Sequence, residues 1–211
     1  MSSDQNQSSD LLRRAGAGDP QAVNELFGRY RDRLRSMVRL RLNRRLQGRV
    51  DPSDILQDAY LEVCKGFQDY ARQPTMPFFL WLRHITGQKL IAAHRHHLGT
   101  QMRDAGQEVS LYRRALPQAS SVSLAAQLLG RLTTASHAAM RAEVQIRVQE
   151  ILNSMDALDR EVLTLRHFEM LTNEETAHVL DISKKAASNR YIRALKRLKD
   201  IVSGMPGLLD A

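Results

Sequence analysis

The sequence predicts an all-α protein with two small helical domains joined by a long linker. Long stretches contain no proline, and their apolar residues recur at the three- and four-residue spacing of helices, without the sustained alternation of strands. Residues 99–136 break this pattern, because Ser, Thr, Gln and Ala dominate there and Pro117 interrupts the segment. Such a connection is longer than those that usually join packed helices, so it predicts a linker between two domains.

The first predicted domain covers residues 19–98. It follows a polar segment, residues 1–18, that we expect to be poorly ordered. Asp19 is a suitable N-cap and Pro20 suits the first position of a helix, so the first helix is expected from residue 21 to about residue 46.

The second helix has a clearer start. Asp51 caps it, Pro52 takes its first position, and Asp54 places a negative charge at the positive helix end. This helix is expected to end near Tyr70 and to turn four apolar side chains toward a core, namely Ile55, Ala59, Val63 and Phe67. A third helix is predicted over residues 78–98, aromatic at its start and basic at its end.

Beyond the third helix, residues 99–136 form the predicted linker, in which the apolar run 124–132 can form one helix. Helices resume at about residue 137, and we expect the second domain to cover residues 137–203. Residues 204–211 are predicted to be a tail.

Composition limits the partners and the compartment. Lys and Arg total 31 against 23 Asp and Glu, a net charge of +8 that favours a polyanion, either nucleic acid or an anionic membrane surface. The single cysteine, Cys64, excludes an internal disulfide, fits a reducing compartment and is expected to be a small buried residue. The sequence starts with no signal peptide and has no apolar run of roughly 18 residues, so we expect a cytoplasmic protein without membrane insertion.

The strongest local pattern, near the C-terminus, is a helix-turn-helix. Its parts follow in order: a helix capped by Asp159 and ending near Met170, a capping box of Thr172 and Glu175 that opens a short helix over 173–180, a turn at 181–183, and a last helix over 184–202 capped by Ser183.

The last helix divides its side chains between two faces. An apolar stripe is expected to be buried, with Ala187, Tyr191, Ala194, Leu195, Leu198 and Val202. The opposite face has no acidic residue and is typical of DNA readers, whose second helix enters the major groove. A solvated face on an ordinary helical hairpin is the alternative, and the caps and the turn favour DNA binding. The basic face contains Lys184, Lys185, Ser188, Asn189, Arg190, Arg193, Lys196, Arg197 and Lys199.

Charge is also segregated in the first domain. Residues 29–49 hold nine arginines and one aspartate, whereas residues 51–69 hold five acidic residues and one lysine. Asp54, Asp58 and Glu62 recur every four positions, so they share a helix face and repel one another by roughly 0.2–0.5 kcal/mol per pair. This face either pairs with the arginine-rich segment of the same chain or binds a basic partner, and charge alone leaves both alternatives open.

Residues 78–103 interleave aromatic and basic side chains, an arrangement that single-stranded nucleic acid binding requires because bases stack on exposed rings. The alternative is that the aromatic residues belong to the core, which we favour for Trp81. His94, His96 and His97 cluster here, but these helical positions do not all share a face, and the sequence has no metal-ligand or phosphate-loop motif. We therefore expect no metal, no cofactor and no enzymatic activity.

Taken together, three segments resemble the extracytoplasmic-function (ECF) group of bacterial RNA polymerase sigma factors. The family's acidic core-binding helix is similar to DPSDILQDAYLEVCKGFQDY, and its promoter-melting helix to FFLWLRHITGQKLIAAHRHH. Its reader of the −35 promoter element is similar to MDALDREVLTLRHFEMLTNEETAHVLDISKKAASNRYIRALKRLK. The resemblance covers about residues 19–95 and 143–199, and it leaves the linker uncovered.

The resemblance implies a subunit that binds RNA polymerase core and directs promoter recognition, DNA melting and transcription initiation. The implied contacts with the polymerase β′ clamp helices are Asp54, Gln57, Asp58 and Glu62. Those with the −10 element are Tyr70, Arg72, Gln88, Lys89 and Arg95. Those with the −35 element are Lys184, Lys185, Ser188, Asn189, Arg190, Ile192, Arg193 and Lys196.

The resemblance further implies contact with the polymerase β flap, with double- and single-stranded promoter DNA, and with an anti-sigma protein, for which no residue of the sequence argues. Many relatives have Gly in the turn where this sequence has Asp181, a residue type that tolerates left-handed backbone. The competing hypothesis is a helix-turn-helix regulator that binds an operator without polymerase, and the acidic helix is the feature that distinguishes the two.

Overall fold

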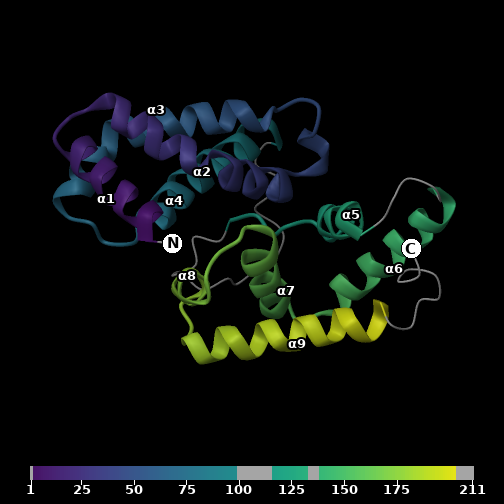
Figure 1. Ribbon diagram of the computed structural model, residues 1–211. Coiled ribbons are helices and arrows are strands. Elements are labelled where there is room, and N and C mark those ends of the chain that lie inside the picture. Colours follow the sequence, from purple (N-terminus) through teal and green to yellow (C-terminus); the bar gives the residue numbers. More distant parts are fainter. Residues whose placement is uncertain (1, 99–115, 133–137, 203–211) are drawn as a thin grey trace. The chain divides into compact units, whose positions relative to one another are not determined.

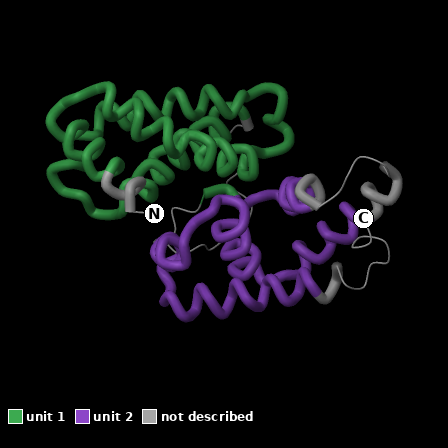
Figure 2. The backbone as a smooth tube through the Cα atoms, in the orientation of Figure 1, with its two compact units in different colours: residues 1–117 green, residues 118–211 purple. Residues whose placement is uncertain are grey.

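The computed structural model describes residues 2–98, 116–132 and 138–202, and every regular element in these ranges is helical (Figure 1). The all-α prediction is therefore confirmed. The chain divides into two compact units, residues 1–117 and residues 118–211 (Figure 2).

In its described residues, unit 1 is a bundle of four α-helices and one 3₁₀ turn. Its elements are α1 (Ser2–Gly16), α2 (Pro20–Arg41), η1 (Arg44–Leu46), α3 (Pro52–Arg72) and α4 (Phe78–Leu98). Helices α2, α3 and α4 pack on one another, and α1 packs on α2 and α3. The core is filled by fully buried side chains from these helices, among them Leu26, Leu34, Met37, Val63, Leu82 and Leu90.

The predicted helix starts of unit 1 are confirmed by their caps. Asp19 accepts hydrogen bonds from the backbone N–H of Gln21 at 2.9 Å and of Ala22 at 3.3 Å. Asp51 accepts one from Ser53 N–H at 2.7 Å. The ends differ, because α2 stops at Arg41 and η1 replaces its predicted last turn, while α3 continues two residues past Tyr70.

The polar start of the chain was predicted to be poorly ordered, and this differs from the structure. Residues 2–16 form α1, which buries Leu11 and Ala15 to 4% and 1% exposure. Arg14 also binds Asp19, with its Nη2 at 2.7 Å from the carboxylate. Buried Leu11 and Ala15, the Arg14–Asp19 ion pair and hydrogen bonds from Arg29 of α2 hold a helix whose sequence is largely polar. Tertiary contacts thus outweigh the local composition.

Aromatic side chains close one end of the unit 1 core. The Tyr70 ring stacks on Trp81, with centroids 4.5 Å apart and planes at 18°. Phe67 and Phe78 meet both rings edge-on or tilted at 5.7–6.3 Å. Trp81 is half-buried within this cluster, so it lies at the edge of the core and not inside it.

The middle of the predicted linker, at residues 116 and 117, packs on the helices of unit 1. A Cβ atom added at the buried Gly87 of α4 would lie 2.1 Å from Cδ2 of Leu116, so the leucine occupies the space that a side chain would need. The next residue is held as well, because Arg41, only 2% exposed, donates from Nη1 to the Pro117 carbonyl at 3.0 Å. Residues 99–115 of the predicted linker lie outside the described residues.

Unit 2 begins inside the predicted linker. Helix α5 (Ser121–Leu132) packs on α6 (Ala138–Ser154), and Leu124 and Ala125 are fully buried. The apolar run 124–132 therefore belongs to the second unit and not to a free connection. The remaining elements are α7 (Ala157–Leu163), a π-helical turn η3 (Thr164–Phe168), α8 (Asn173–Leu180) and α9 (Lys184–Val202).

The start of α7 corrects the predicted cap. Asp156, not Asp159, is the N-cap, and it accepts hydrogen bonds from Leu158 N–H at 3.0 Å and Asp159 N–H at 3.2 Å. Asp159 lies in the first turn and is buried. The π-helical turn ends before Met170, whose positive φ of 59° reverses the chain.

The helix-turn-helix is confirmed in its local geometry. Thr172 Oγ1 accepts from Glu175 N–H at 3.1 Å, and the Glu175 carboxylate accepts from Thr172 N–H at 2.7 Å, which completes the capping box of α8. Asp181 takes the left-handed conformation with φ 53°. Ser183 Oγ then accepts from Ala186 N–H at 3.1 Å at the start of α9.

Candidate nucleic-acid interface

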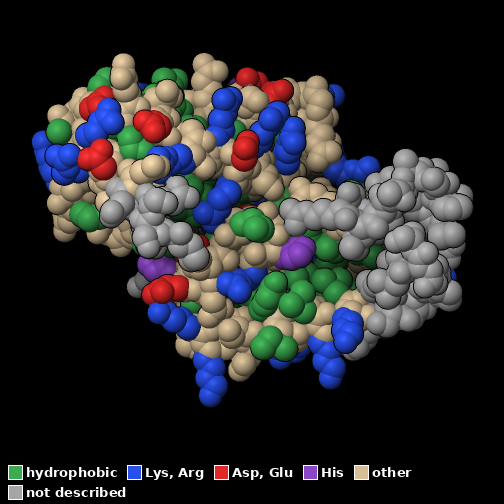
Figure 3. Space-filling view, in the orientation of Figure 1, with side chains coloured by type: hydrophobic (Ala, Val, Ile, Leu, Met, Phe, Trp, Pro, Cys, Tyr) green, Lys and Arg blue, Asp and Glu red, His purple; other side chains and the backbone are tan. Residues whose placement is uncertain are grey.

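The outward face of α9 is polar, basic and exposed. Lys185, Asn189, Ile192 and Lys196 follow one another at spacings of four, three and four residues, so they share a face opposite the buried Ala187 and Ala194. Ile192 is 64% exposed in the middle of this face. Figure 3 shows lysine and arginine side chains projecting from the edge of unit 2 along which α9 runs.

The remaining predicted residues at the start of α9 lie at the edge of this face. Ser188 is half-buried, and Lys184 is exposed but forms an ion pair with Glu174 of α8 at 2.7 Å. Leu195, predicted in the buried stripe, is 37% exposed, and the Val202 side chain lies outside the described residues.

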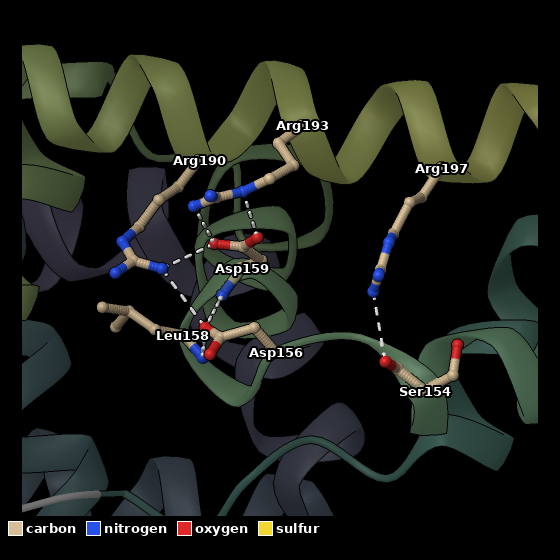
Figure 4. A network of polar contacts seen from close by, with 7 residues as sticks. All are labelled: Ser154, Asp156, Leu158, Asp159, Arg190, Arg193 and Arg197. Atoms are coloured by element: carbon tan, nitrogen blue, oxygen red, sulfur yellow. Dashed lines mark hydrogen bonds and ion pairs between the residues drawn. The ribbon is translucent and has the colours of Figure 1, made fainter.

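Three arginines on one side of α9 bind the end of α6 and the start of α7 (Figure 4). Arg193 forms a two-pronged pair with Asp159, its Nε 2.6 Å from one carboxylate oxygen and its Nη2 3.0 Å from the other. Arg190 Nη1 lies 2.7 Å from Asp159 and 3.2 Å from Asp156. Arg197 donates to the Ser154 carbonyl at 3.1 Å. We call Arg190, Arg193 and Arg197 the arginine row.

The carboxylates of this network differ in burial. The Asp159 side chain is 6% exposed, so its charge depends on the two guanidinium groups for compensation. The Asp156 side chain is 62% exposed. Burial raises its pKa, but the backbone N–H groups of α7 and the nearby Arg190 and Arg193 outweigh that effect, and the pKa of Asp156 lies below its ordinary value.

In unit 1, the acidic face of α3 is exposed along its length. Asp54, Gln57, Asp58 and Glu62 all lie on the surface, opposite the buried Val63. Sequence reasoning missed Leu61, which is 52% exposed among them, and its signal was an apolar residue on the polar side of the helix. We call Asp54, Gln57, Asp58, Leu61 and Glu62 the acidic row.

The acidic row has one internal pair. Lys89 Nζ of α4 lies 2.8 Å from Glu62 Oε2, and the hydrogen bond from Lys89 lowers the pKa of the Glu62 carboxyl. Asp54 and Asp58 have no ion pair with a residue that the structure describes. In the described part of the chain, Glu62 is therefore the one residue of the acidic row with an ion pair. Its partner lies on α4 and not in the arginine-rich segment.

The arginine-rich segment has other contacts. Arg33 stacks on Phe79 with its Cζ 3.6 Å from the ring centroid, Arg29 lies 3.8 Å from Glu25 on the same helix, and Arg41 binds Pro117. In these contacts the three arginines bind groups outside the acidic row.

The residues predicted to contact the −10 element have different surroundings. Arg95 is exposed near the end of α4, and Gln88 is half-buried on the same helix. Arg72 is exposed at the end of α3, 3.5 Å from Asp69. Tyr70 is half-buried, its hydroxyl donates to the Met76 carbonyl at 2.9 Å, and burial raises its pKa.

Among the described residues, the histidines and the cysteine do not gather into a metal site. No three His, Cys, Asp or Glu side chains come together as metal ligands in the described ranges. His94 is 3% exposed, its Nε2 accepts from Asn43 N–H at 3.2 Å, and burial lowers its pKa. Cys64 was expected to be buried, but it is exposed, because α3 turns it away from the Val63 side of the helix.

A short capped helix, a tight turn and a following helix with an exposed basic face define unit 2 as a helix-turn-helix DNA-binding unit. No helix in the parts of the chain that are described is long and apolar enough to span a membrane. The class of protein is thus a helical DNA-binding transcription factor with a second, acidic surface.

Comparisons with known proteins give the family. The family model "ECF sigma factor" matches residues 5–201. The chain is 27% identical over 190 residues to the ECF RNA polymerase sigma factor SigD of Mycobacterium tuberculosis and of Mycobacterium bovis, which covers 90% of this chain and 81% of each relative. The chain belongs to the ECF sigma factor family, whose members work with RNA polymerase at promoter DNA.

A solved structure shows the same fold. CnrH, solved in complex with the cytosolic domain of CnrY, aligns with a TM-score of 0.53 at 22% identity, over 94% of this chain and 98% of that chain. The expectation of a sigma factor that directs transcription initiation is confirmed by the family match.

Proposed function

We propose that this sigma factor holds RNA polymerase core through the acidic row of α3 and reads the promoter through α4 and α9. The observation that carries the proposal is the exposure of the acidic row, in which two of three carboxylates lack an ion pair in the described part of the chain. The factor acts without catalysing a reaction of its own, in the cytoplasm, where the polymerase works.

The acidic row suits a basic helical partner, and we assign it to the β′ clamp helices. Like charges at four-residue spacing disfavour the free helix slightly, and a basic partner relieves that repulsion. Leu61 lies between Asp58 and Glu62 and supplies the apolar contact that a charged surface alone lacks. Complementary charge of this kind speeds association and selects the partner.

The −10 contacts are assigned to the middle and end of α4 and to the end of α3. Gln88 and Arg95 would contact the melted strand, and Arg72 would bind its phosphates. Tyr70 has a supporting role in this proposal, because its ring is stacked on Trp81 and its hydroxyl holds the loop at Met76. Lys89 forms an ion pair with Glu62, so this lysine lies between the acidic row and the proposed −10 surface.

The −35 contacts are assigned to the outward face of α9. Asn189 and Ser188 would bond to base edges in the major groove, and Ile192 would pack on a thymine methyl group. Lys185 and Lys196 would bind phosphates. Lys184 would contribute less to phosphate binding, because it already forms an ion pair with Glu174. Arg190 and Arg193, predicted from sequence to contact DNA, are assigned to the network with Asp159.

Two further partners follow from the family. Contact of unit 2 with the β flap is expected, and an inhibitory anti-sigma protein is expected to cover the factor when it is silent. The solved complex of CnrH with a second chain supports the idea that factors of this fold bind regulatory partners.

The decisive experiment is reconstitution of the full chain with core polymerase, followed by mapping of transcript starts. Asp58→Arg with Glu62→Arg should abolish core binding, because the surface changes sign. Asp10→Arg with Asp32→Arg is the matched control, since it changes the net charge equally at exposed positions of α1 and α2.

Retention of core binding by the α3 variant would contradict the assignment of the acidic row. A chain that binds one duplex tightly by itself and ignores core polymerase would instead be the operator-binding regulator. A sigma factor binds promoter DNA weakly alone and selectively with core enzyme.

A further inference from the structure

The network between α7 and α9 separates the charges of the recognition helix into two groups. Asp156, Asp159, Arg190 and Arg193 carry two negative and two positive charges, so together they are neutral. Lys185 and Lys196, on the outward face, have no acidic partner in the described part of the chain. Fewer positive charges are thus available to DNA than the number of basic residues on α9 indicates.

The positions of the two arginines follow from the helix period. Arg190 and Arg193 are three residues apart, and the buried Ala187 and Ala194 lie beside Arg190 on the wheel. Arg190 is 29% exposed, which leaves little of its guanidinium for another ligand. Arg193 is 57% exposed at the edge of the outward face, so it is the residue that DNA can reach.

We propose that Asp159 is a specificity-determining residue, because it withholds Arg190 and Arg193 from the DNA phosphates and leaves sequence reading to the outward face of α9. The proposal rests on the assignment of α9 as the DNA reader. Transfer of Arg193 to a phosphate would leave the Asp159 carboxylate, 6% exposed, with one guanidinium in place of two. Burial makes that loss unfavourable, so the arginine stays with Asp159.

The consequence for DNA binding is a lower non-specific affinity. Each phosphate that a cation neutralises adds about 0.9 to the slope of log affinity against log salt, and this electrostatic contact is independent of sequence. Two arginines held by Asp159 remove up to two such contacts. Base contacts by Asn189 and Ile192 are retained, so the ratio of promoter binding to non-specific binding rises.

The test measures binding of the full chain to a labelled duplex of arbitrary sequence between about 50 and 200 mM salt. Asp159→Asn, an isosteric change, should tighten binding and steepen the salt slope by about 0.9 for each arginine released. For one arginine, the gain over the unmodified chain should then shrink by about 3.5-fold across that salt range. Asp181→Asn is the matched control, because it removes one negative charge beside α9 at a position without an arginine partner in the described residues.

A double-mutant cycle links the effect to Arg193. In the Arg193→Gln background, Asp159→Asn should steepen the slope by about 0.9 less than it does alone. Arg193→Gln by itself should leave the slope unchanged, since the arginine is already neutralised. If Asp159→Asn fails to fold, the salt slope of Arg193→Gln alone still tests the proposal.

Three results would overturn the proposal: an unchanged slope in folded Asp159→Asn, an equal effect of Asp181→Asn, or a slope that falls by about 0.9 in Arg193→Gln alone. The assay needs neither promoter nor polymerase. Failure of the proposed function would appear separately, as absence of core binding by the unmodified chain.

Discussion

The contact between Gly87 and Leu116 gives a sharp test of how the middle of the predicted linker packs on α4. In a helix interior, replacing glycine by alanine normally stabilises by about 0.8–1.0 kcal/mol. At Gly87 the new methyl group would meet Leu116 Cδ2 at 2.1 Å, with Cγ and Cδ1 at 3.2 and 3.3 Å. Overpacking of this kind costs about 1–3 kcal/mol, so Gly87→Ala should be neutral to destabilising by about 2 kcal/mol.

Removal of the leucine side chain should reverse the sign. Leu116→Ala deletes all three atoms that crowd the added methyl group. In that background Gly87→Ala should stabilise by about 1 kcal/mol, which implies a coupling of at least about 1 kcal/mol between the two positions. Urea unfolding of the four chains in the cycle, followed by circular dichroism, measures this coupling.

The same free-energy change for Gly87→Ala in both backgrounds would refute the reasoning, because Leu116 would then not occupy the space beside Gly87. Gly28→Ala is a suitable reference for helix propensity alone, since no atom lies within 4 Å of a Cβ added there. That variant should be stabilising by about 0.8–1.0 kcal/mol in every background.

Three further predictions follow from the sites described above. Thr172→Ala should destabilise unit 2 by about 1 kcal/mol through loss of the capping box, whereas Thr172→Ser should retain most of the stability in the same unfolding assay. The low pKa of His94 means that the unfolded chain binds the proton more readily, so the stability of unit 1 should fall as pH drops below about 6.5, and His94→Gln should flatten that dependence in melts at a series of pH values. With holoenzyme, Asn189→Ala should change sequence preference by about 1–3 kcal/mol at one position of the −35 element, whereas Lys185→Ala should weaken all sequences alike and reduce the salt slope by about 0.9. Equal weakening of all sequences by Asn189→Ala would show that this residue does not read a base.

Local sequence signals predicted most of the helices and the helix-turn-helix. Asp19 with Pro20, Asp51 with Pro52, and Thr172 with Glu175 are caps whose hydrogen bonds are made within a few residues, so they can be recognised without tertiary information. The acidic row was likewise visible from the four-residue spacing of its carboxylates.

Features that depend on contacts between distant segments were not predictable in this way. Helix α1 has a largely polar sequence and is held by its packing and polar contacts with α2 and α3, and α5 joins unit 2 through its packing on α6. Arg193 and Asp159 are separated by 34 residues, and nothing in the local pattern of α9 distinguishes Arg193 from Lys196. Cys64 was misjudged because its place on α3 depends on which face the rest of the bundle covers.

The arginine row has a practical consequence for anyone who wishes to redirect this factor to other promoters. A library randomised across the whole basic side of α9 would place many of its substitutions at positions 190, 193 and 197. Most replacements there would loosen the attachment of the helix to its own domain. Variation confined to positions 188, 189 and 192 would sample new base contacts on an unchanged support.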